Sequence, residues 1–395
     1  MSQDSLKIVT PHAVEISARQ KRTQRVLYLT DLHPADKFGS LEEQILVLSK
    51  ALDASGGALI PVFGAPVGRE TAAQYRELGV NPESLDLHRY SLFSLWRLLS
   101  LVRRYQIDAI HWNFYNPINP YVLALSMLVP HVRHYLTDHN SRIPNETVSA
   151  GSVKRRLKRF LLKRYSRVLC ISDFVQEQLH VQQVWPKLSR CIYFVNTARF
   201  RPDPPLRLQW RTKLGLADPG KFVIIFVGKL IKWKGVDVAI RAMLQLPESA
   251  TLLVVGDGPV EPELRELATS LKLGDRVRFV GNQRNVEPYM QAADCFICPS
   301  LWGEAVGLVN IEALASGLPV VASRVGGIPE FIDDKVTGLL FNAGDDAGLA
   351  DRLNFLIENP RILKYMSNKA RTFAVEKYSI QKRVPDYLEL YTSKV

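Results

Sequence analysis

Two acidic residues eight positions apart, Glu304 and Glu312, lie on either side of a glycine at the start of a helical pattern. Gly307 lets another group approach the backbone closely. The amides of Gly307, Leu308 and Val309 then point out of the helix start, where free donors and the helix dipole bind phosphate. A carboxylate is badly suited to phosphate but accepts hydrogen bonds from hydroxyl groups. An ordinary surface helix has the same spacing, so the interpretation depends on the neighbouring segments.

A second segment places lysines and glycines directly after a strand. Residues 222–227 form a continuous apolar run, which predicts a strand buried on both faces. Gly228, Lys229, Lys234 and Gly235 follow it, before the next helical pattern. Two ammonium groups at one turn can neutralise a leaving diphosphate as its charge develops. A solvated basic turn is the alternative interpretation.

Two further glycine turns carry weaker information. Gly256 and Gly258 resemble the start of a dinucleotide-binding fingerprint, but Glu261 occupies the place of its third glycine. A tight turn between a strand and a helix accounts for them better. Gly326 and Gly327 form another turn after a strand, and such turns often serve only close backbone packing.

Cysteine and histidine patterns predict no metal site. The cysteines are few, which fits a reducing compartment rather than a disulfide scaffold: Cys170, Cys191, Cys295 and Cys298. Cys295 and Cys298 have the spacing of a redox or zinc pair, but they lie in an apolar run that predicts a strand. Residues three apart on a strand point to opposite faces, so we expect two buried structural thiols. For the same reason His131, His134 and His139 would not share one face of a strand.

Composition limits the class of protein. The chain has 395 residues, of which 47% are hydrophobic and 23% charged, as in a folded protein of two domains. Its net charge of +12 favours phosphorylated ligands, an anionic membrane or nucleic acid as partners. No zinc finger, RNA-recognition signature or basic zipper appears, so we expect no nucleic-acid partner. The sequence starts without a secretory signal, and its longest apolar run, residues 121–129, is too short to span a bilayer.

Strand and helix patterns alternate along both halves of the chain. The expected strands cover residues 25–30, 58–63, 107–111, 132–136 and 168–171, then 222–227, 251–255, 277–280, 295–298 and 320–323. This alternation predicts two doubly wound, parallel α/β sheets. Ligands bind such sheets at the carboxyl ends of the strands, so the cleft between the two domains is the expected site.

The expected domain boundaries follow from this pattern. We expect a loose N-terminal extension over residues 1–24, a first domain over 25–200 and a second domain over 207–375. The proline-rich residues 201–205 would stop any regular element between the two domains. A terminal segment, 376–395, carries a helix that could pack back on the first domain.

Taken together, these segments resemble the retaining glycosyltransferases of family 4, which have the GT-B fold. The matching residues run in the family's order: Gly228, Lys229, Lys234, Gly235, Val255–Pro259, Phe279–Gly281, Ala293, Asp294, Pro299, Ser300, Glu304–Glu312, Gly317–Ala322, Gly326, Gly327 and Glu330. They cover most of residues 222–345, and the coincidence of so many short patterns makes the resemblance specific. The first half matches more loosely, at residues 108–111, 137–139, 195–196 and 200–202.

The sequence departs from the family pattern at four places. Ser40 follows Gly39 where a second glycine is usual, and Thr197 stands in place of glycine before the hinge. Lys229 replaces the usual arginine, which keeps the charge but loses the planar fork. Val306 stands where phenylalanine is common. These differences bear on the shape of the donor-sugar pocket.

The resemblance implies a division of labour among the site residues. Lys229, Lys234 and the helix start at Gly307 would hold the donor diphosphate, Glu312 the ribose hydroxyls and Glu304 the transferred sugar. The turn after Gly281 would flank the base, and His139 would lie in the cleft near the reacting carbon. The expected catalytic residues are Lys229, Lys234, Glu304 and His139, and the expected donor-binding residues are Gly39, Gly228, Gly281, Gly307, Leu308, Val309 and Glu312. The family is generally metal-independent, so we expect no metal or other cofactor.

The implied partners are a nucleotide-diphosphate sugar, a glycan or lipid-linked acceptor and an anionic membrane surface. Residues 154–165 are strongly basic, with Val153, Leu157, Phe160 and Leu161 at helical spacing, and residues 94–104 add a second basic amphipathic face. Such faces fit peripheral contact with anionic lipid. Core-facing helices with solvated basic sides fit equally well, and both interpretations stay open. A cytoplasmic protein, peripheral at the inner face of the membrane, is the expected localisation.

Three other classes of protein share parts of the pattern. A nucleotide-sugar epimerase or a dinucleotide-dependent oxidoreductase uses similar domains, although the missing third glycine disfavours the latter. A non-catalytic sugar- or nucleotide-binding module would also keep the fold. The joint presence of Lys229, Lys234, Glu304 and Glu312 argues against it.

Overall fold

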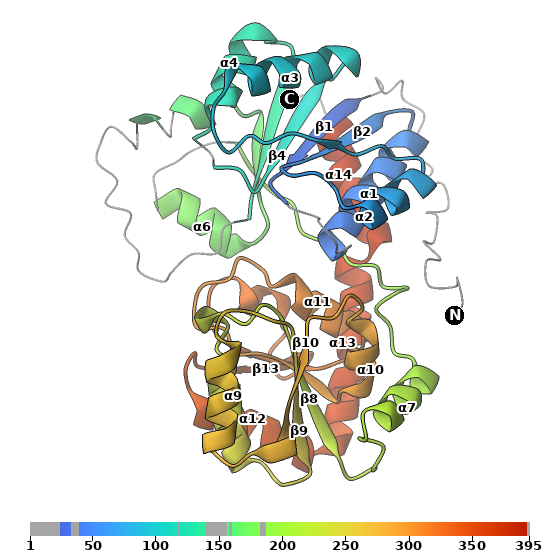
Figure 1. Ribbon diagram of the computed structural model, residues 1–395, viewed down its shortest axis with the longest axis vertical. Helices are drawn as coiled ribbons and strands as arrows, with labels where there is room; N and C mark the ends of the chain where they lie inside the picture. The colour runs from blue at the N-terminus through green and yellow to red at the C-terminus, as the bar shows by residue number, and fades with distance from the viewer. Residues whose placement is uncertain are drawn as a thin grey trace.

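The chain folds into two α/β units, which Figure 1 shows one above the other. This computed structural model describes residues 24–32, 39–116, 118–139, 156–157, 160–181 and 187–392. The first unit holds a seven-stranded sheet with strand order β3-β2-β1-β4-β5-β6-β7, and the second holds a six-stranded sheet with order β10-β9-β8-β11-β12-β13. Paired strands run parallel in both sheets, which confirms the predicted fold class.

The strands of the first sheet are β1 (Arg25–Thr30), β2 (Ala58–Phe63), β3 (Glu83–Ser84), β4 (Ala109–Asn113), β5 (Arg133–Asp138), β6 (Arg167–Cys170) and β7 (Leu188–Arg190). Those of the second are β8 (Phe222–Val227), β9 (Ala250–Val255), β10 (Val277–Gly281), β11 (Cys295–Cys298), β12 (Val320–Ser323) and β13 (Gly338–Phe341). The helices described are α1 (Ser40–Ala54), α2 (Arg69–Glu77), α3 (Leu92–Arg104), α4 (Pro120–Leu128), α6 (Asp173–Val181), α7 (Pro204–Lys213), α8 (Val236–Ala242), α9 (Glu261–Ser270), α10 (Glu287–Ala292), α11 (Leu308–Ala315), α12 (Asp346–Glu358), α13 (Pro360–Tyr378) and α14 (Ile380–Thr392).

Central strands are apolar on both faces because helices cover both sides of each sheet. In β8, Ile224 packs into one hydrophobic cluster and Ile225 into another. In β11, Cys295 and Cys298 divide between the same two clusters, and both thiols are buried and free. The prediction of two structural thiols on opposite faces of a strand is therefore confirmed.

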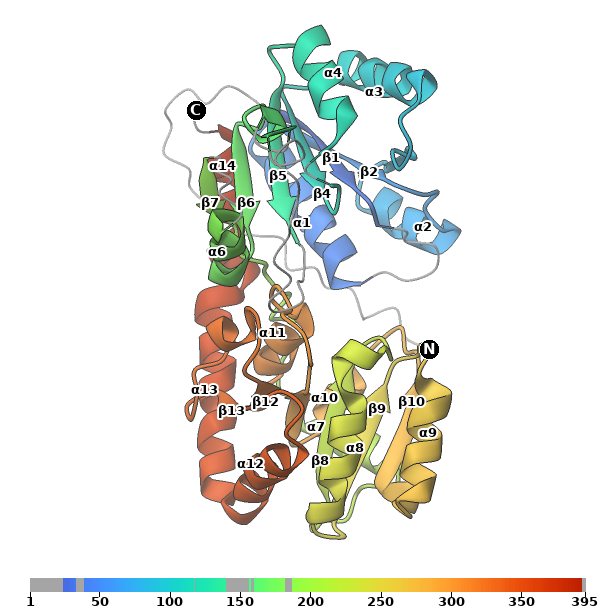
Figure 2. The same cartoon turned by 90° about the vertical axis from the view of Figure 1, so that its left-hand side faces the viewer.

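The chain crosses between the units twice, in two adjacent segments. The amide of Val195 donates to the carbonyl of Tyr378 at 2.9 Å, where the outgoing and returning chains meet. Figure 2 shows α13 along the second unit and α14 continuing along the first. Tyr387 and Tyr391 of α14 share a buried cluster with Tyr28 of β1. The last helix thus completes the core of the first unit.

The proline-rich segment between the units differs from expectation. We expected it to stop regular structure, but α7 begins inside it, at Pro204. The Asp203 side chain caps the helix by accepting from the Leu206 amide at 3.0 Å. Proline is tolerated in the first turn of a helix because the amide it lacks would have no partner there.

Two other expectations fall partly outside the described residues. Of the expected N-terminal extension, only Gln24 is described, and of the basic stretch 154–165, residues 154, 155, 158 and 159 are not. Within the described part of the chain, no helix combines the length and apolar character needed to cross a membrane.

Candidate active site

The loops after β8 and β11 pack closely at the carboxyl edge of the second sheet. Gly235 has φ 66°, and a Cβ there would lie 2.0 Å from the carbonyl oxygen of Pro299. Only glycine fits both the backbone conformation and this contact. The contact holds the short 3₁₀ turn Lys232–Lys234 against the loop that carries Glu304.

Lys234 and Glu304 form an ion pair at this edge. The Lys234 ammonium lies 2.9 Å from the Glu304 carboxylate, which also accepts from the Ser300 hydroxyl. Glu304 is only 4% exposed. Burial lowers the pKa of Lys234, but the nearby charge and hydrogen bond of Glu304 outweigh burial, so the pKa is raised above its ordinary value. Lys234 is therefore a permanent cation at the carboxyl edge of the second sheet.

The start of α11 lies beside this pair. Gly307 occupies its N-cap with φ 72°, and no side chain of the described residues caps the helix. A Cβ at Gly307 would lie 2.6 Å from the Asn310 amide and 3.4 Å from the Glu304 carboxylate. Leu308 and Val309 form the first turn. The glycine therefore leaves room at a helix start where backbone donors can bind an anion.

Glu312, one turn further along α11, faces the first unit. It is 8% exposed and accepts a hydrogen bond from the Ser40 hydroxyl, at the start of α1. Burial raises the pKa of Glu312, while the Ser40 hydrogen bond and the charge of Arg199 oppose that effect. Gly39, just before Ser40, donates its amide to Glu42 at 2.9 Å. The structure thus brings the Gly39 turn of the first unit and Glu312 of the second unit together.

His139 follows β5 on the first unit, and both of its ring nitrogens have partners. Nε2 lies 3.1 Å from the Asn113 side-chain oxygen, and Nδ1 meets the Tyr193 hydroxyl. The Asn113 amide nitrogen points toward the carbonyls of Leu29 and His111, so its oxygen must accept from Nε2–H. Burial, with the charge of His111 adding to it, lowers the pKa of His139 to about 3. His139 is therefore a neutral imidazole with its proton on Nε2.

Gly228 and Lys229 follow β8 and Gly281 ends β10, the two strands that flank β9. A Cβ at Gly256 would lie 1.9 Å from the Gly228 carbonyl oxygen, and the Gly256 amide donates to Gly281 at 2.9 Å. These close contacts support the interpretation of Gly256 as a tight packing turn. Lys229 is exposed and forms no ion pair with any described residue. Lys229 is not part of the ion pair between Lys234 and Glu304.

Glu330 links the two units, which the sequence did not reveal. Its carboxylate accepts from the amides of Asp173 and Phe174 at 2.6 and 2.7 Å, in the first turn of α6. Arg190 approaches the same carboxylate at 3.2 Å. A carboxylate is favoured at a helix start by the helix dipole. No sequence signal identifies this contact, because the partners lie 140 or more positions away.

Arg199, in the linker, forms a second joint between the units. It pairs with Glu43 of α1 at 3.1 Å and with Glu287 of α10. Asn196 also donates to Glu43, at 2.6 Å. One linker side chain thus bridges a helix of each unit.

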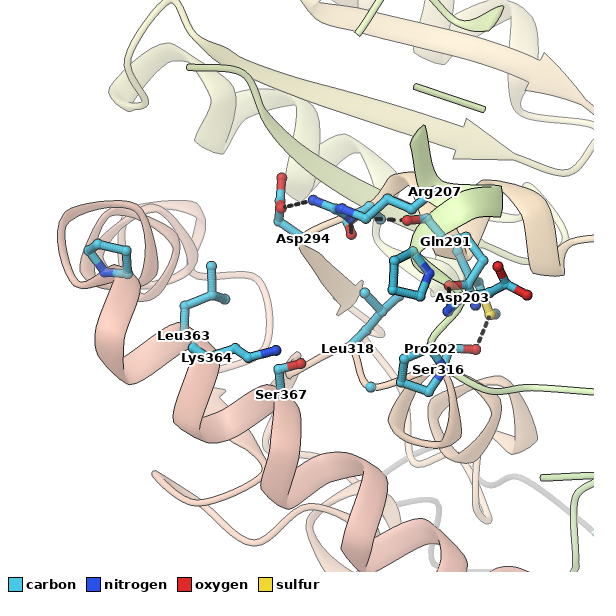
Figure 3. A pocket seen from close by; sticks show the side chains of 15 residues that line it. Pro202, Asp203, Arg207, Gln291, Asp294, Ser316, Leu318, Leu363, Lys364 and Ser367 are labelled. Carbon is cyan, nitrogen blue, oxygen red and sulfur yellow. Dashed lines mark hydrogen bonds and ion pairs between the residues drawn. The ribbon is translucent and has the colours of Figure 1, made fainter. Parts of the chain in front are cut away.

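Asp294 lies at the opposite edge of the second sheet, before β11. Figure 3 shows it beside the pocket formed by α7, α10 and α13, with Arg207 directed at it. Its carboxylate accepts from Arg207 at 2.6 Å, from Arg211 at 2.5 Å and from the Val223 amide at 2.7 Å. Asp294 is therefore a structural anchor rather than part of the cleft.

Known proteins share this architecture and these sequence patterns. The family model "Glycosyltransferase Family 4" matches residues 41–194, and the model "Glycosyl transferases group 1" matches residues 209–373. N-acetyl-alpha-D-glucosaminyl L-malate synthase of Bacillus anthracis is 27% identical over 330 residues, covering 80% of this chain and 83% of that protein. Lipopolysaccharide core biosynthesis glycosyltransferase LpsD of Rhizobium meliloti (strain 1021) is 32% identical over 197 residues, covering 50% and 55%.

A solved structure agrees with this at the level of the fold. Anabaena Alr3699/HepE in complex with UDP superposes with a TM-score of 0.78 at 21% identity, covering 93% of this chain and 100% of that one. The two family models together span both α/β units. The chain belongs to glycosyltransferase family 4, the group 1 glycosyl transferases, whose members are retaining, nucleotide-sugar-dependent enzymes with the GT-B fold.

Proposed function

We propose that this enzyme transfers a hexose-type sugar to a glycan or lipid-linked acceptor in the synthesis of a cell-surface polysaccharide or lipopolysaccharide. The observation that carries the proposal is the cationic Lys234 beside an uncapped helix start, with a carboxylate on each side at Glu304 and Glu312. The relatives' names point the same way, since one is a lipopolysaccharide core glycosyltransferase. An epimerase of similar fold is the alternative.

The proposed roles follow from the geometry. During transfer the bond between the sugar carbon and the diphosphate oxygen breaks, and its electron pair stays with the leaving diphosphate. Lys234 and the amides at the start of α11 stabilise that growing charge. Glu304 accepts from sugar hydroxyls, and Glu312 accepts from ribose hydroxyls that replace the Ser40 hydroxyl. Lys229, exposed after β8, adds a second positive charge at the same edge of the sheet.

His139 contributes as a positioned neutral group rather than as a base. With a pKa of about 3, the ring neither gains nor loses charge between pH 5 and 8. Its Nε2–H points toward Asn113, so a sugar hydroxyl would bind at the ring edge only by sharing or displacing that contact.

A thermal-shift screen tests the donor assignment. We expect one of the UDP-, GDP- and ADP-sugars to raise the melting temperature, because a ligand at a hundredfold excess over its dissociation constant stabilises the folded state by about 2.7 kcal/mol. UDP-glucose is tested first, since one similar structure was solved with it. Analysis of labelled product separates transfer from epimerisation. No stabilisation by any nucleotide sugar would remove the basis of the proposal.

We further propose that the first unit contacts an anionic membrane through α3 and α4. These helices lie together at the end of the first unit farther from the second (Figure 1). Leu92, Phe93 and Trp96 are 75%, 66% and 62% exposed, and Met127 and Leu128 of α4 are exposed as well. Exposed apolar side chains of this size on two helices of one unit fit an interaction surface.

Basic side chains accompany this patch. Arg103 and Arg104 end α3, and each basic residue near an anionic surface adds about 1 kcal/mol. In the basic segment 154–165, Leu161 is buried but Leu157 and Phe160 are each 46% exposed, so that helix does not face the core alone. Apolar insertion and charge attraction together fit an anionic lipid surface at the cytoplasmic face.

Vesicle co-sedimentation tests this surface. We expect the wild-type protein to bind vesicles containing phosphatidylglycerol at low salt and to dissociate at high salt. Trp96→Glu should reduce the bound fraction severalfold, because it removes an apolar anchor and adds repulsion. Leu244→Glu, at a 53% exposed position on the second unit, serves as the matched control. Equal binding by both variants, or no salt-sensitive binding, would count against the membrane contact.

A further inference from the structure

Phe114, the residue directly after β4, has an unusual backbone for an aromatic residue. Its φ is 65°, in the left-handed region that bulky side chains rarely adopt. The other non-glycine residues with positive φ in the described chain are polar: Gln106, Lys272 and Lys335. Such a conformation persists only where the surroundings impose it, and these positions concentrate at functional sites. The Phe114 side chain nevertheless remains 37% exposed.

The Phe114 ring is held in one orientation by the residues behind it. It stacks on His139 with the ring centroids 3.9 Å apart and the planes 10° apart. His139 stacks in turn on Tyr193, with the ring centroids 5.6 Å apart and the planes 17° apart. Its ring nitrogens are hydrogen-bonded to Tyr193 and Asn113. Tyr193 is buried. A rigid stack therefore supports one face of the Phe114 ring and leaves part of that ring open.

The stack stands at the carboxyl edge of the first sheet. Parallel pairing sets Thr30, Asn113 and Thr137 side by side at the carboxyl ends of β1, β4 and β5. Phe114 follows Asn113 directly, so it lies at this edge. Ser40, at the start of α1 in the same unit, donates a hydrogen bond to Glu312 of the second unit.

We propose that Phe114 is a platform for a pyranose ring. One face of a pyranose carries mainly C–H groups, which pack on an aromatic face while the hydroxyls stay free for polar partners. The groups suited to the donor nucleotide, Lys234, Glu304 and Glu312, all lie on the second unit. A sugar on Phe114 would lie across the cleft from them, which assigns the platform to the acceptor sugar. The assignment rests on the proposed transfer to a glycan.

Ligand-detected NMR with nucleotide-saturated protein tests the platform. The probes are the methyl α-pyranosides of glucose, mannose and galactose, and the nucleotide is whichever of UDP, GDP and ADP stabilises the protein most. We expect Phe114→Gly to weaken binding of the best pyranoside about five- to tenfold. Phe114→Tyr keeps the ring and should bind within about twofold of wild type. Nucleotide affinity should be unchanged in both variants.

Phe114→Gly tests whether pyranoside binding needs the aromatic ring in a protein that is still folded. Glycine adopts the left-handed backbone without strain, which offsets part of the packing lost with the ring, and the melting temperature of each variant is measured beside its binding. Equal pyranoside binding by wild type and Phe114→Gly, or no pyranoside binding to wild type, would overturn the platform. If Phe114→Gly instead weakens binding of the nucleotide sugar but not of the nucleotide, the ring holds the donor sugar, and the acceptor assignment fails. The protein could bind no nucleotide and still bind a pyranoside in a way that depends on Phe114. That result would support the platform and refute the proposed function.

Discussion

Lys234→Ala should lower the rate of nucleotide release from the donor sugar by a factor of about 10²–10³, the usual effect of removing one group that stabilises a developing negative charge. Lys234 is the cation that the structure fixes at the cleft, with its ammonium 2.9 Å from Glu304. Donor hydrolysis by water gives the readout without an identified acceptor. Because Glu304 is buried and loses its counter-ion in this variant, circular dichroism and thermal melting are measured first, and the rate is taken from folded protein.

Two companion variants sharpen this prediction. Lys232→Ala removes an equal charge from the same 3₁₀ turn, at an exposed position, and should leave hydrolysis unchanged. Glu304→Gln keeps the shape and the contact with Ser300 but loses the charge that orients Lys234, and should also reduce hydrolysis sharply. A Lys234→Ala protein that hydrolyses the donor at the wild-type rate would exclude the assigned role.

Asp294→Ala should lower the free energy of unfolding by about 3–5 kcal/mol, because it leaves a buried guanidinium without its counter-ion. Arg211 is only 9% exposed and lies 2.5 Å from the Asp294 carboxylate, which also binds Arg207 and the Val223 amide. Urea unfolding followed by circular dichroism measures the change. The folded fraction should keep its nucleotide affinity, since Asp294 lies at the edge of the sheet away from the cleft.

A surface ion pair provides the comparison. Asp237 and Arg241 are paired four residues apart on α8, with 33% and 46% of their side chains exposed. Asp237→Ala should therefore cost only about 0.3–0.5 kcal/mol. A similar small loss for Asp294→Ala would mean that the anchor contributes no more than an exposed pair.

Much of the architecture could be predicted because strands buried on both faces have a distinctive sequence. The run Phe222–Val227 is apolar throughout, and the structure places it in the centre of the second sheet. The pattern of Glu304, Gly307 and Glu312 likewise predicted the start of α11 correctly. These features depend on residues close in sequence, where spacing determines position.

The contacts between the units could not be predicted, because they depend on how two separate folds meet. Ser40 and Glu312 are 272 positions apart, and neither has a local pattern that identifies the other. The sequence also assigned Lys234 and Glu304 separate roles, to phosphate and to sugar, whereas they bind each other in the structure. At Pro204, proline indicated a break, yet it begins a helix.

The position of α14 has a consequence for the order in which the protein is completed during synthesis. Strands β1 to β7 have all left the ribosome once Arg190 has emerged, but Tyr387 and Tyr391, which close their core, come some 200 residues later. At about 5–20 residues per second this is a delay of roughly 10–40 s. The second unit ends at Tyr378, so its last residue is also synthesised before Tyr387 and Tyr391. The N-terminal sheet therefore lacks a helix throughout this interval, and a chaperone that shields apolar surface would act on that sheet.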